Sequence, residues 1–215
     1  MRKPPQKRAY DSSARRAAAQ MTRRSILECA RRLFLEKGYA ATTMPAIARA
    51  ADVAPDTVYA AVGTKGQLFR LLVEAALSGQ DEEVPADERD YVRTIRAEPD
   101  AARKLQIYGS ALGEIQPRLA PLFQVLQAAA PLDADLKALW QEISGRRATN
   151  MRLLAVNLIA TGRVRADLSP SIVADILWSM NSPEFYLLLV QHRGWRADAF
   201  GLWLGDAWIR LLLVP

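Results

Sequence analysis

Two short helical segments separated by only three residues constrain the fold of this chain more than any other feature. The first segment should be capped by Thr42-Thr43, accept Pro45 in its first turn and end near Ala51. The second should run from Pro55 to near Val62, just before Gly63. Asp52-Val53-Ala54 forms the tight turn between them, and a wedge of small apolar side chains is spaced to hold them together: Ile47, Ala48, Ala51, Val53 and Val58. This layout is that of a helix-turn-helix.

Longer helices should flank this pair. Apolar residues at the i, i+3, i+4, i+7, i+8 spacing predict a helix from near Ser13 to Lys37, with an inner face of Ile26, Cys29, Ala30, Leu33 and Phe34. Gly38 is expected just past its end. Cys29 lies inside the stripe, which predicts a core thiol. Thr64 can cap a fourth helix that carries Leu68, Phe69, Leu72 and Val73.

The remainder of the chain also reads as helical. No alternating strand pattern is present, and proline and glycine are expected to divide the segments at Pro117, Pro121, Pro131, Gly162, Pro170, Pro183 and Gly194. The acidic stretch GQDEEVPADERD, from Gly79, should be a loop or a frayed helix end. The last helix has the clearest apolar stripe: Phe200, Trp203, Leu204, Ala207, Trp208, Leu211 and Leu212. This stripe must be covered by its own core, by a second subunit, or by both.

Charge is distributed unevenly along the chain. Residues 1–70 hold 14 Lys and Arg against 5 Asp and Glu, whereas the remaining residues hold 15 against 18. A basic N-terminal third on a mildly acidic body indicates a nucleic-acid or membrane-surface contact at one end, with a solvated arginine-rich face as the alternative. The apolar runs are too short to cross a bilayer, and no apolar stretch follows the basic N-terminus, so we expect a cytoplasmic protein without a membrane contact.

Several classes of chemistry find no support in the sequence. One cysteine and one histidine exclude a disulfide framework and a cysteine-rich zinc site, and no carboxylate cluster has metal-ligand spacing. The segment GTKGQ lacks the spacing of a phosphate-binding loop. Cys29 and His192 could pair only if the buried position expected for Cys29 were wrong. We therefore expect no catalytic residue, cofactor or metal, and keep a helical small-molecule carrier with an incidental basic end as the alternative function.

The run LFLEKGYAATTMPAIARAADVAPDTVYAAVGTKGQLF resembles the DNA-binding domain of tetracycline-repressor-like (TetR family) transcription regulators. The resemblance covers about Ser25 to Val73. Its matching features are Gly-Tyr at the end of the first helix, paired threonines opening the second, Thr-Val-Tyr in the third and a lysine starting the fourth. The stretch SPEFYLLLVQHRGW is similar to one subgroup, less specifically. Asp52 and Ala54 depart from the glycine and the capping serine or threonine that the family often has there.

The resemblance implies an all-α chain in three parts. Residues 1–12 would be a disordered basic arm, residues 13–63 a three-helix helix-turn-helix DNA-binding domain, and residues 64–215 a larger helical domain for effector binding and dimerisation. It implies a ligand-responsive transcriptional regulator, by family default a repressor. The homodimer would bind a palindromic operator in double-stranded DNA and be released by a small-molecule effector.

The helix that starts at Pro55 should read the DNA bases. On a helix with 100° per residue, Asp56 and Ala60 face outward, with Thr57 and Tyr59 on the flanks. Asp56 can accept a hydrogen bond from a cytosine amino group, Thr57 can form a hydrogen bond or contact a thymine methyl, and Ala60 can contact only the methyl. The resemblance places Tyr59, Lys65 and either Thr42 or Thr43 on phosphates. Salt-sensitive binding should also draw on Lys3, Lys7, Arg8, Arg15, Arg16, Arg23 and Arg24. The arm could enter the minor groove or remain a solvated tail.

The resemblance further implies a ligand pocket among the middle helices and a dimer surface on the C-terminal helices. The candidate pocket residues are Tyr108, Phe123, Trp140, Asn150, Met151 and Trp178, with plain core as the alternative for each. The candidate dimer residues are Ile176, Met180, Trp203, Ala207, Trp208 and Leu211.

Overall fold

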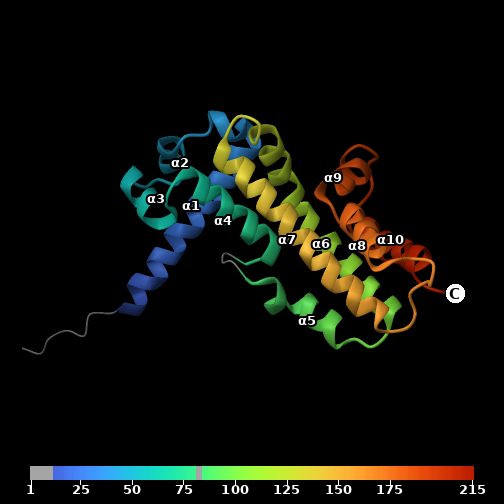
Figure 1. The fold of residues 1–215 in the computed structure, drawn as a ribbon. Coiled ribbons are helices and arrows are strands. Elements are labelled where there is room, and N and C mark those ends of the chain that lie inside the picture. The colour runs from blue at the N-terminus through green and yellow to red at the C-terminus, as the bar shows by residue number, and fades with distance from the viewer. Residues whose placement is uncertain (1–11, 81–83) are drawn as a thin grey trace, which may run out of the picture.

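The computed structural model describes residues 12–80 and 84–215, which are folded into helices joined by short connections (Figure 1). The elements are α1 (Ser12–Ala41), α2 (Met44–Ala50), α3 (Pro55–Val62), α4 (Lys65–Ser78), η1 (Ala86–Glu88), α5 (Asp90–Ala97), α6 (Ala101–Ala129), α7 (Ala134–Ile159), α8 (Pro170–Met180), α9 (Pro183–Tyr186), the π-helical turn η2 (Leu187–Gln191) and α10 (Ala197–Leu212). Within these residues, the β-type pairing is one isolated antiparallel bridge between Val164 and Leu213. None of the described helices is both long and apolar enough to cross a bilayer.

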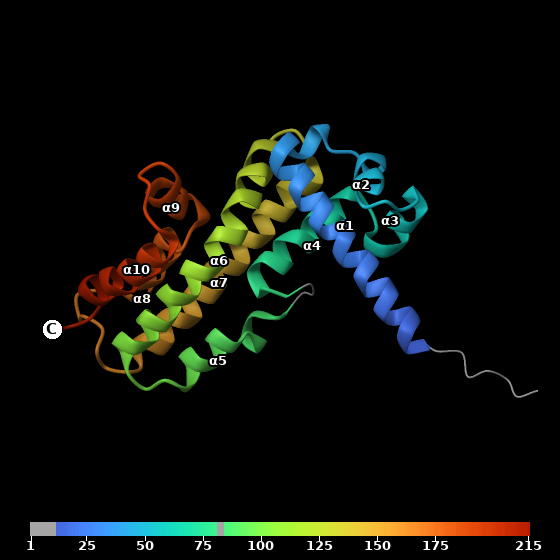
Figure 2. The same ribbon diagram turned by 180° about the vertical axis from the view of Figure 1, so that it is seen from behind.

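The long helices α6 and α7 connect the two ends of the molecule. In both views, α1, α2 and α3 lie at one end and α8 and α10 at the other, while α6 and α7 run side by side between them (Figures 1 and 2). Helix α4 packs against α6 and leads from the α1–α3 end toward α5. The first turns of α1 extend away from the other helices, and their described side chains are exposed from Ala14 to Gln20.

The local signals at the first end are found in the structure. Gly38, with φ 77° and ψ 172°, interrupts the helical geometry of α1, after which one more turn follows. The Thr43 side chain accepts a hydrogen bond from the Ala46 amide and begins α2. Thr64 and Gln67 form a reciprocal capping box at the start of α4, where each side chain accepts from the other's backbone amide. Residues 86–88, within the stretch expected to be a loop, form the short 3-10 helix η1.

Proline does not divide the middle of the chain as the sequence suggested. Pro117 and Pro121 both lie inside α6, which continues unbroken to Ala129. An interior proline removes one intrahelical hydrogen bond and crowds the preceding turn, so it weakens a helix. The apolar face of α6 is long and packs against α1, α4, α7 and α10, and this tertiary packing outweighs the local cost.

One core joins α1–α4 to the near halves of α6 and α7. Phe34 of α1 meets Phe69 of α4 edge-to-face at 5.2 Å between ring centroids, and Tyr39 stacks on Phe34 at 5.6 Å. The same cluster includes Phe123 of α6 and the partly buried Trp140 of α7. Side chains on both sides of the expected boundary between residues 63 and 64 therefore share one hydrophobic core.

A second core holds α10 against α6 through very close backbone contact. A Cβ atom built on Gly109 would lie 2.5 Å from the Gly201 carbonyl oxygen, and one on Gly201 would lie 2.7 Å from that of Gly109. Only glycine permits this approach. It brings the fully buried ring of Trp208 onto Tyr108, with 5.3 Å between centroids and 10° between planes. Helix α10 is therefore an integral part of the protomer core.

Candidate nucleic-acid interface and ligand cavity

Helix α3 presents a polar face to solvent and an apolar face to the core. Val58 and Val62 are buried, whereas Asp56, Thr57 and Ala60 are exposed. Tyr59 is 49% exposed, and Pro55 opens the helix on the same surface. The short α2 packs against α3, and both contact α1, so the exposed face of α3 is held by a rigid three-helix frame.

The turn before α3 adopts a conformation that the sequence only partly indicated. Asp52 has a φ of 54°, in the left-handed region where glycine is favoured and aspartate is tolerated. The α3 N-cap residue, Ala54, provides no side-chain hydrogen bond, so the first amides of α3 depend on other partners. The Thr57 amide is satisfied by the Ala54 carbonyl at 3.0 Å. An exposed helix start without a side-chain cap suits contact with phosphate oxygens.

Of the two threonines assigned to the phosphate backbone, only Thr43 is exposed. The Thr42 side chain is 1% exposed and donates to the carbonyls of Gly38, at 2.8 Å, and Leu33, at 3.1 Å. It therefore closes the end of α1 and cannot contact a phosphate, which corrects the assignment of Thr42 as a DNA-binding side chain. Thr43 caps α2 and remains at the surface.

Lys65 lies at the start of α4 and is partly buried beside Tyr39. Its Nζ atom is 4.0 Å from the centre of the Tyr39 ring, a cation–π contact. Burial lowers the pKa of Lys65, and the carboxylate of Asp133 partly opposes that shift. Burial also raises the pKa of the Tyr39 hydroxyl to about 12, with Asp133 and Asp135 adding to the effect. The ammonium group is thus held in place by a ring that is itself fixed in the core.

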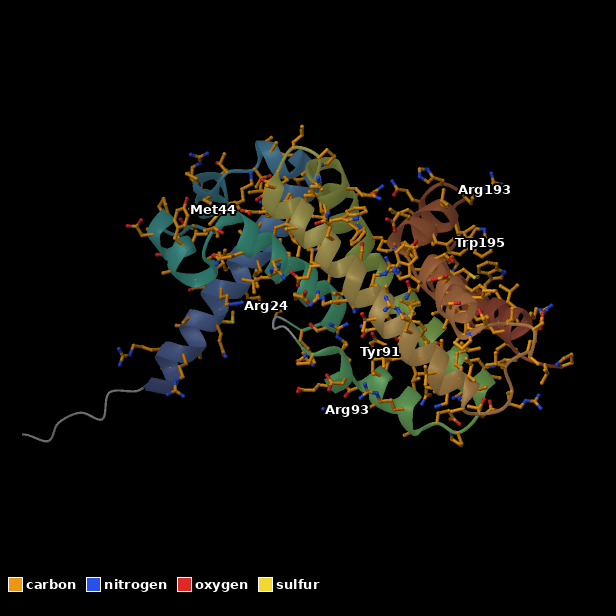
Figure 3. The ribbon with its side chains drawn as sticks, viewed as in Figure 1. Arg24, Met44, Tyr91, Arg93, Arg193 and Trp195 are labelled. Atoms are coloured by element: carbon orange, nitrogen blue, oxygen red, sulfur yellow. The ribbon has the colours of Figure 1, made fainter. Side chains whose placement is uncertain are left out.

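The basic residues of α1 line the part of the helix that extends from the body. Arg15, Arg16 and Arg24 are exposed and Arg23 is half-buried, and Arg24 forms an i, i+4 ion pair with Glu28 at 3.2 Å. Figure 3 shows Arg24 on the projecting stretch of α1. Lys3, Lys7 and Arg8 lie outside the described residues. The same holds for the expected arm at residues 1–12, except for residue 12.

Cys29 is not the fully buried core thiol that the apolar stripe predicted. Its side chain is partly exposed, and its thiol donates to the Ala50 carbonyl oxygen at 3.2 Å. The position faces the C-terminal end of α2, which leaves part of the side chain exposed. His192 is exposed at the end of η2. Cys29 and His192 lie at different ends of the molecule, so they form no nucleophile pair.

A cavity of about 550 Å³ lies between the end of α4, the segment of residues 86–96, α6, α7 and the junction of α8 with α9. Tyr108, Asn150 and Met151, which were predicted as pocket residues, line it together with Tyr91 of α5. Figure 3 shows Tyr91 on the side of α5 that faces α7 and Arg93 on the outer side. Tyr91 stacks on Tyr108 at 6.1 Å. The volume lies in the range of about 300–1,000 Å³ that is typical of small-molecule sites.

A polar network crosses one wall of the cavity. The Asn181 side-chain amide donates to the Tyr108 hydroxyl oxygen at 2.8 Å, and its carbonyl oxygen accepts from Nη2 of Arg147 at 2.6 Å. Gln116 donates from Nε2 to the Asn181 backbone carbonyl at 2.8 Å. Burial raises the pKa of Tyr108 well above its usual value, so its hydroxyl stays protonated. It also lowers the pKa of Arg147, against the opposing effects of Tyr108 and Glu184.

Three other residues predicted for the pocket lie elsewhere. Phe123 is buried and its ring lies 4.9 Å from that of Trp140, in the core shared with α1–α4. Trp178 is 37% exposed and lies under the guanidinium of Arg147 at 5.1 Å. The aromatic character of these residues suggested a pocket, but their helix faces turn toward the neighbouring core or the outer surface. This corrects their assignment to the cavity lining.

The apolar stripe of α10 is divided between the protomer core and the surface. Phe200, Leu204, Trp208 and Leu212 are completely buried within the protomer. Trp208 is therefore removed from the expected dimer surface. Of the other candidates, Trp203 is 38% and Leu211 44% exposed, while Ile176, Met180 and Ala207 are half-buried. Exposed Ile172, Trp178 and Leu202 lie on the same two helices, α8 and α10.

The sequence reading missed the charged and polar residues that organise the interior. Arg147 and Gln116 line the cavity, and the Asn181 side chain joins them. Glu74 of α4 is 1% exposed and pairs with Arg146 of α7, with Arg89 4.0 Å away. The sequence signal for these ion pairs was Glu74 itself, a glutamate among the apolar positions of α4, because a buried carboxylate requires a partner.

The comparisons with known proteins agree on the first end of the molecule and on the fold. Residues 26–72 match the sequence model of the family described as "Bacterial regulatory proteins, tetR family". The fold is similar to that of NalD, the secondary repressor of the MexAB-OprM multidrug efflux pump in Pseudomonas aeruginosa, with a TM-score of 0.69, 24% identity, and coverage of 92% of this chain and 98% of that one.

Two further solved structures share the fold. A transcriptional regulator from Saccharomonospora viridis in complex with choline has a TM-score of 0.66 and 18% identity, covering 91% of this chain and all of that one. A TetR transcription regulator from Haloarcula marismortui has a TM-score of 0.64 and 14% identity, with coverage of 91% and 100%. No curated protein matches the chain.

Proposed function

Because this chain belongs to the tetR family of bacterial regulatory proteins through its N-terminal helices, we propose that it is a ligand-responsive repressor. In this proposal a homodimer binds a palindromic operator through α3 of each subunit and is released when a small molecule occupies the cavity. The DNA-binding unit would span residues 13–63, preceded by a basic arm at 1–12 and followed by the effector and dimerisation part at 64–215.

The observation that carries the proposal is the exposed polar face of α3. Asp56 and Thr57 lie in its first turn, where the recognition helix of a helix-turn-helix approaches the base edges. Tyr59 and Thr43 would contact the phosphate backbone from the same surface. Ala60 would contact a thymine methyl or leave its base pair unread. Lys65, held at the adjoining helix start, would add a positive charge.

Helix α4 supports a route from the cavity to α3. Arg70 forms a bidentate ion pair with Glu142 of α7, with contacts of 2.7 and 2.6 Å, and the buried Glu74 pairs with Arg146. Leu77, near the end of α4, and Arg89 both line the cavity. An occupant that contacts these two residues would shift α4 relative to α7 and so change the separation of the two reading helices. A ligand can act in this way only if it binds one separation better than the other.

The surface of α8 and α10 is the proposed dimer interface. Trp203 and Leu211 of α10 and Ile176 and Met180 of α8, with the half-buried Ala207, are the residues that would meet their counterparts. Trp203 is ordered by stacking on Phe185 at 6.1 Å and by an edge contact with Trp195 at 5.3 Å. A rigid aromatic group at a half-exposed position suits an interface core.

Selection of bound sequences from a random DNA library, using the full chain, tests the proposal. We expect an enriched palindrome whose half-site centres are about 34–36 Å apart, one helical turn of DNA. A matched variant with Thr57→Ala and Tyr59→Ala should keep its thermal stability, since both side chains are exposed, and should lose the enrichment. Absence of any enriched motif from the unaltered chain, in a band-shift with competitor DNA as well, would support the alternative of a helical small-molecule carrier.

A further inference from the structure

Two polar side chains that line the cavity each have a buried oxygen atom without a hydrogen-bond partner. Oε1 of Gln116 and Oδ1 of Asn157 are inaccessible to solvent and accept no hydrogen bond from the described residues. The Gln116 side chain is 1% exposed and is fixed by the bond from its Nε2 to Asn181. An unsatisfied buried acceptor costs about 1–3 kcal/mol. Both residues line the cavity, but these two oxygen atoms are not exposed to it, so the polar contacts of an occupant must come mainly from other groups.

Arg147 supplies the main charge on the cavity wall. Its two hydrogen bonds, to the Trp178 carbonyl at 2.7 Å and to Oδ1 of Asn181 at 2.6 Å, both come from Nη2. Nε and Nη1 donate to no described residue, and no described carboxylate lies within ion-pair distance of the guanidinium. Glu184 is the acidic group that acts on it from a distance. A partly buried arginine without a counter-ion is costly, and an anion in the cavity would pair with its free donors.

The charged residues of the whole lining are positive in balance, and most of the remaining lining is apolar. Its charged members are Arg89, Arg96 and Arg147 against Asp87 alone. Arg89 is the arginine already near an acid, Glu74, while Arg96 and Asp87 are exposed. The walls are formed by apolar side chains: Leu77, Ile95, Leu112, Ile115, Leu119 and Leu154. An occupant therefore needs a substantial apolar body and one anionic group.

The aromatic residues do not favour a cation instead. Rings can bind an ammonium group over an open face. Tyr91 and Trp208 both stack on Tyr108, with interplanar angles of 12° and 10°, so the face of Tyr108 is covered. The ring of Trp178 already lies beside Arg147.

We propose that the cavity binds an amphipathic organic anion, whose acidic group pairs with Nε and Nη1 of Arg147 and whose apolar body lies between α5, α6 and α7. This assignment rests on the proposed role of the cavity as the effector site. It adds the charge of the effector, which neither the family nor the fold determines.

Three probes with one ten-carbon chain and different head groups test this assignment: decanoate, decan-1-ol and decyltrimethylammonium. Calorimetric titration of the full chain without DNA should give the tightest binding for decanoate, by about tenfold or more over the alcohol, with the cation weakest. Equal affinity for all heads, preference for the cation, or no decanoate binding up to its solubility limit would overturn the assignment.

Variants locate the effect at Arg147. Arg147→Gln should reduce decanoate affinity by about tenfold or more while leaving decan-1-ol binding within about twofold, and Arg147→Lys should restore part of the preference. Arg152→Gln, on the same helix but exposed and outside the cavity, is the matched control and should change nothing. If Arg147→Gln fails to fold, the order of the three probes on the unaltered chain still decides.

Failure of this inference is distinguishable from failure of the proposed function. The titrations contain no DNA, and the library selection contains no ligand. A selected palindrome together with a preference for the cationic probe would overturn only the effector class. Strong decanoate preference without any selected palindrome would instead retain the anion site and overturn the regulator.

Discussion

The two ends of this molecule are specified by the sequence over very different distances. The surface of α3 is formed by residues that lie within one eight-residue helix, Pro55–Val62. The cavity takes its lining from α4, the segment of residues 86–96, α6, α7 and the α8–α9 junction. A recognition surface of the first kind is determined by local turns and caps, whereas the second exists only after distant helices have packed.

The difference also appears in how each end is stabilised. At the α1–α4 end, the core is formed by side-chain contacts, with the rings of Phe34, Tyr39 and Phe69 at its centre. At the other end, α6 and α10 approach so closely that glycine is required at Gly109 and Gly201. The second end should therefore tolerate much less change in side-chain volume.

The largest expected effect is a loss of stability at Trp208, which lies on the buried face of α10. Trp208→Ala removes a fully buried ring that stacks on Tyr108, and should lower the free energy of unfolding by about 3–5 kcal/mol. Trp203→Ala is the matched control on the same helix and should cost only about 1–2 kcal/mol, from its ring contacts. Chemical denaturation monitored by circular dichroism measures both.

Protein concentration sharpens this comparison. If Trp203 lies in the dimer interface, the stability of Trp203→Ala should depend on concentration less steeply than that of the unaltered chain, because weaker association adds less stability, and light scattering should show weakened association. The cost at Trp208 should be nearly the same at every concentration. Equal losses for the two variants would mean that both faces of α10 belong to one core.

The sequence predicted the first end well because its signals are local. The caps at Thr43 and Thr64, and the limits of α3, follow from side-chain chemistry within a few residues. Thr42 was misplaced because paired threonines look alike in sequence. Only the return of the chain after Gly38 turns the Thr42 hydroxyl onto the Leu33 carbonyl.

The second end was predictable only in outline. Helical periodicity identified the stripe of α10. It could not show that Trp208 is buried and Trp203 partly exposed, because that difference depends on how α6 crosses α10. Aromatic residues attracted attention to Phe123 and Trp140, whereas the cavity is organised by Arg147 and Gln116. Charged residues on an otherwise amphipathic helix are normally solvated, so only the tertiary structure distinguishes Arg147 from Arg152.

A smaller effect is expected at Lys65, on DNA binding rather than on the fold. Lys65→Ala should weaken binding to all sequences alike and flatten the slope of log affinity against log salt by about one unit per subunit. Arg193→Ala is the control, because Arg193 is exposed and lies at the end of the molecule opposite α3 (Figure 3). Filter binding across a series of salt concentrations measures both slopes. An unchanged slope in Lys65→Ala would remove the residue from the phosphate contact and leave it as a partner of Tyr39 alone.

The smallest effect on total affinity, and the most specific one, is expected at Asp56. Its carboxylate is exposed in the first turn of α3 and can accept from a cytosine amino group but repels most acceptors in the major groove. Asp56→Ala should therefore relax the preference at one base pair in each half-site, a loss of discrimination of about 1–3 kcal/mol, with only a modest change in total affinity. Library selection compares the two motifs.

Asparagine at the same position gives the stricter test, because it keeps the shape and replaces one acceptor by a donor. Asp56→Asn should shift the preferred base toward adenine, whose N6 amino group donates to the asparagine oxygen and whose N7 atom accepts from the asparagine amide. Asp52→Asn is the control: it removes the same charge from the adjoining turn, and asparagine tolerates the positive φ of 54° at that position. A motif that stays the same in Asp56→Ala and Asp56→Asn would show that base selection resides in Thr57 or in DNA shape, and that the charge on α3 only repels.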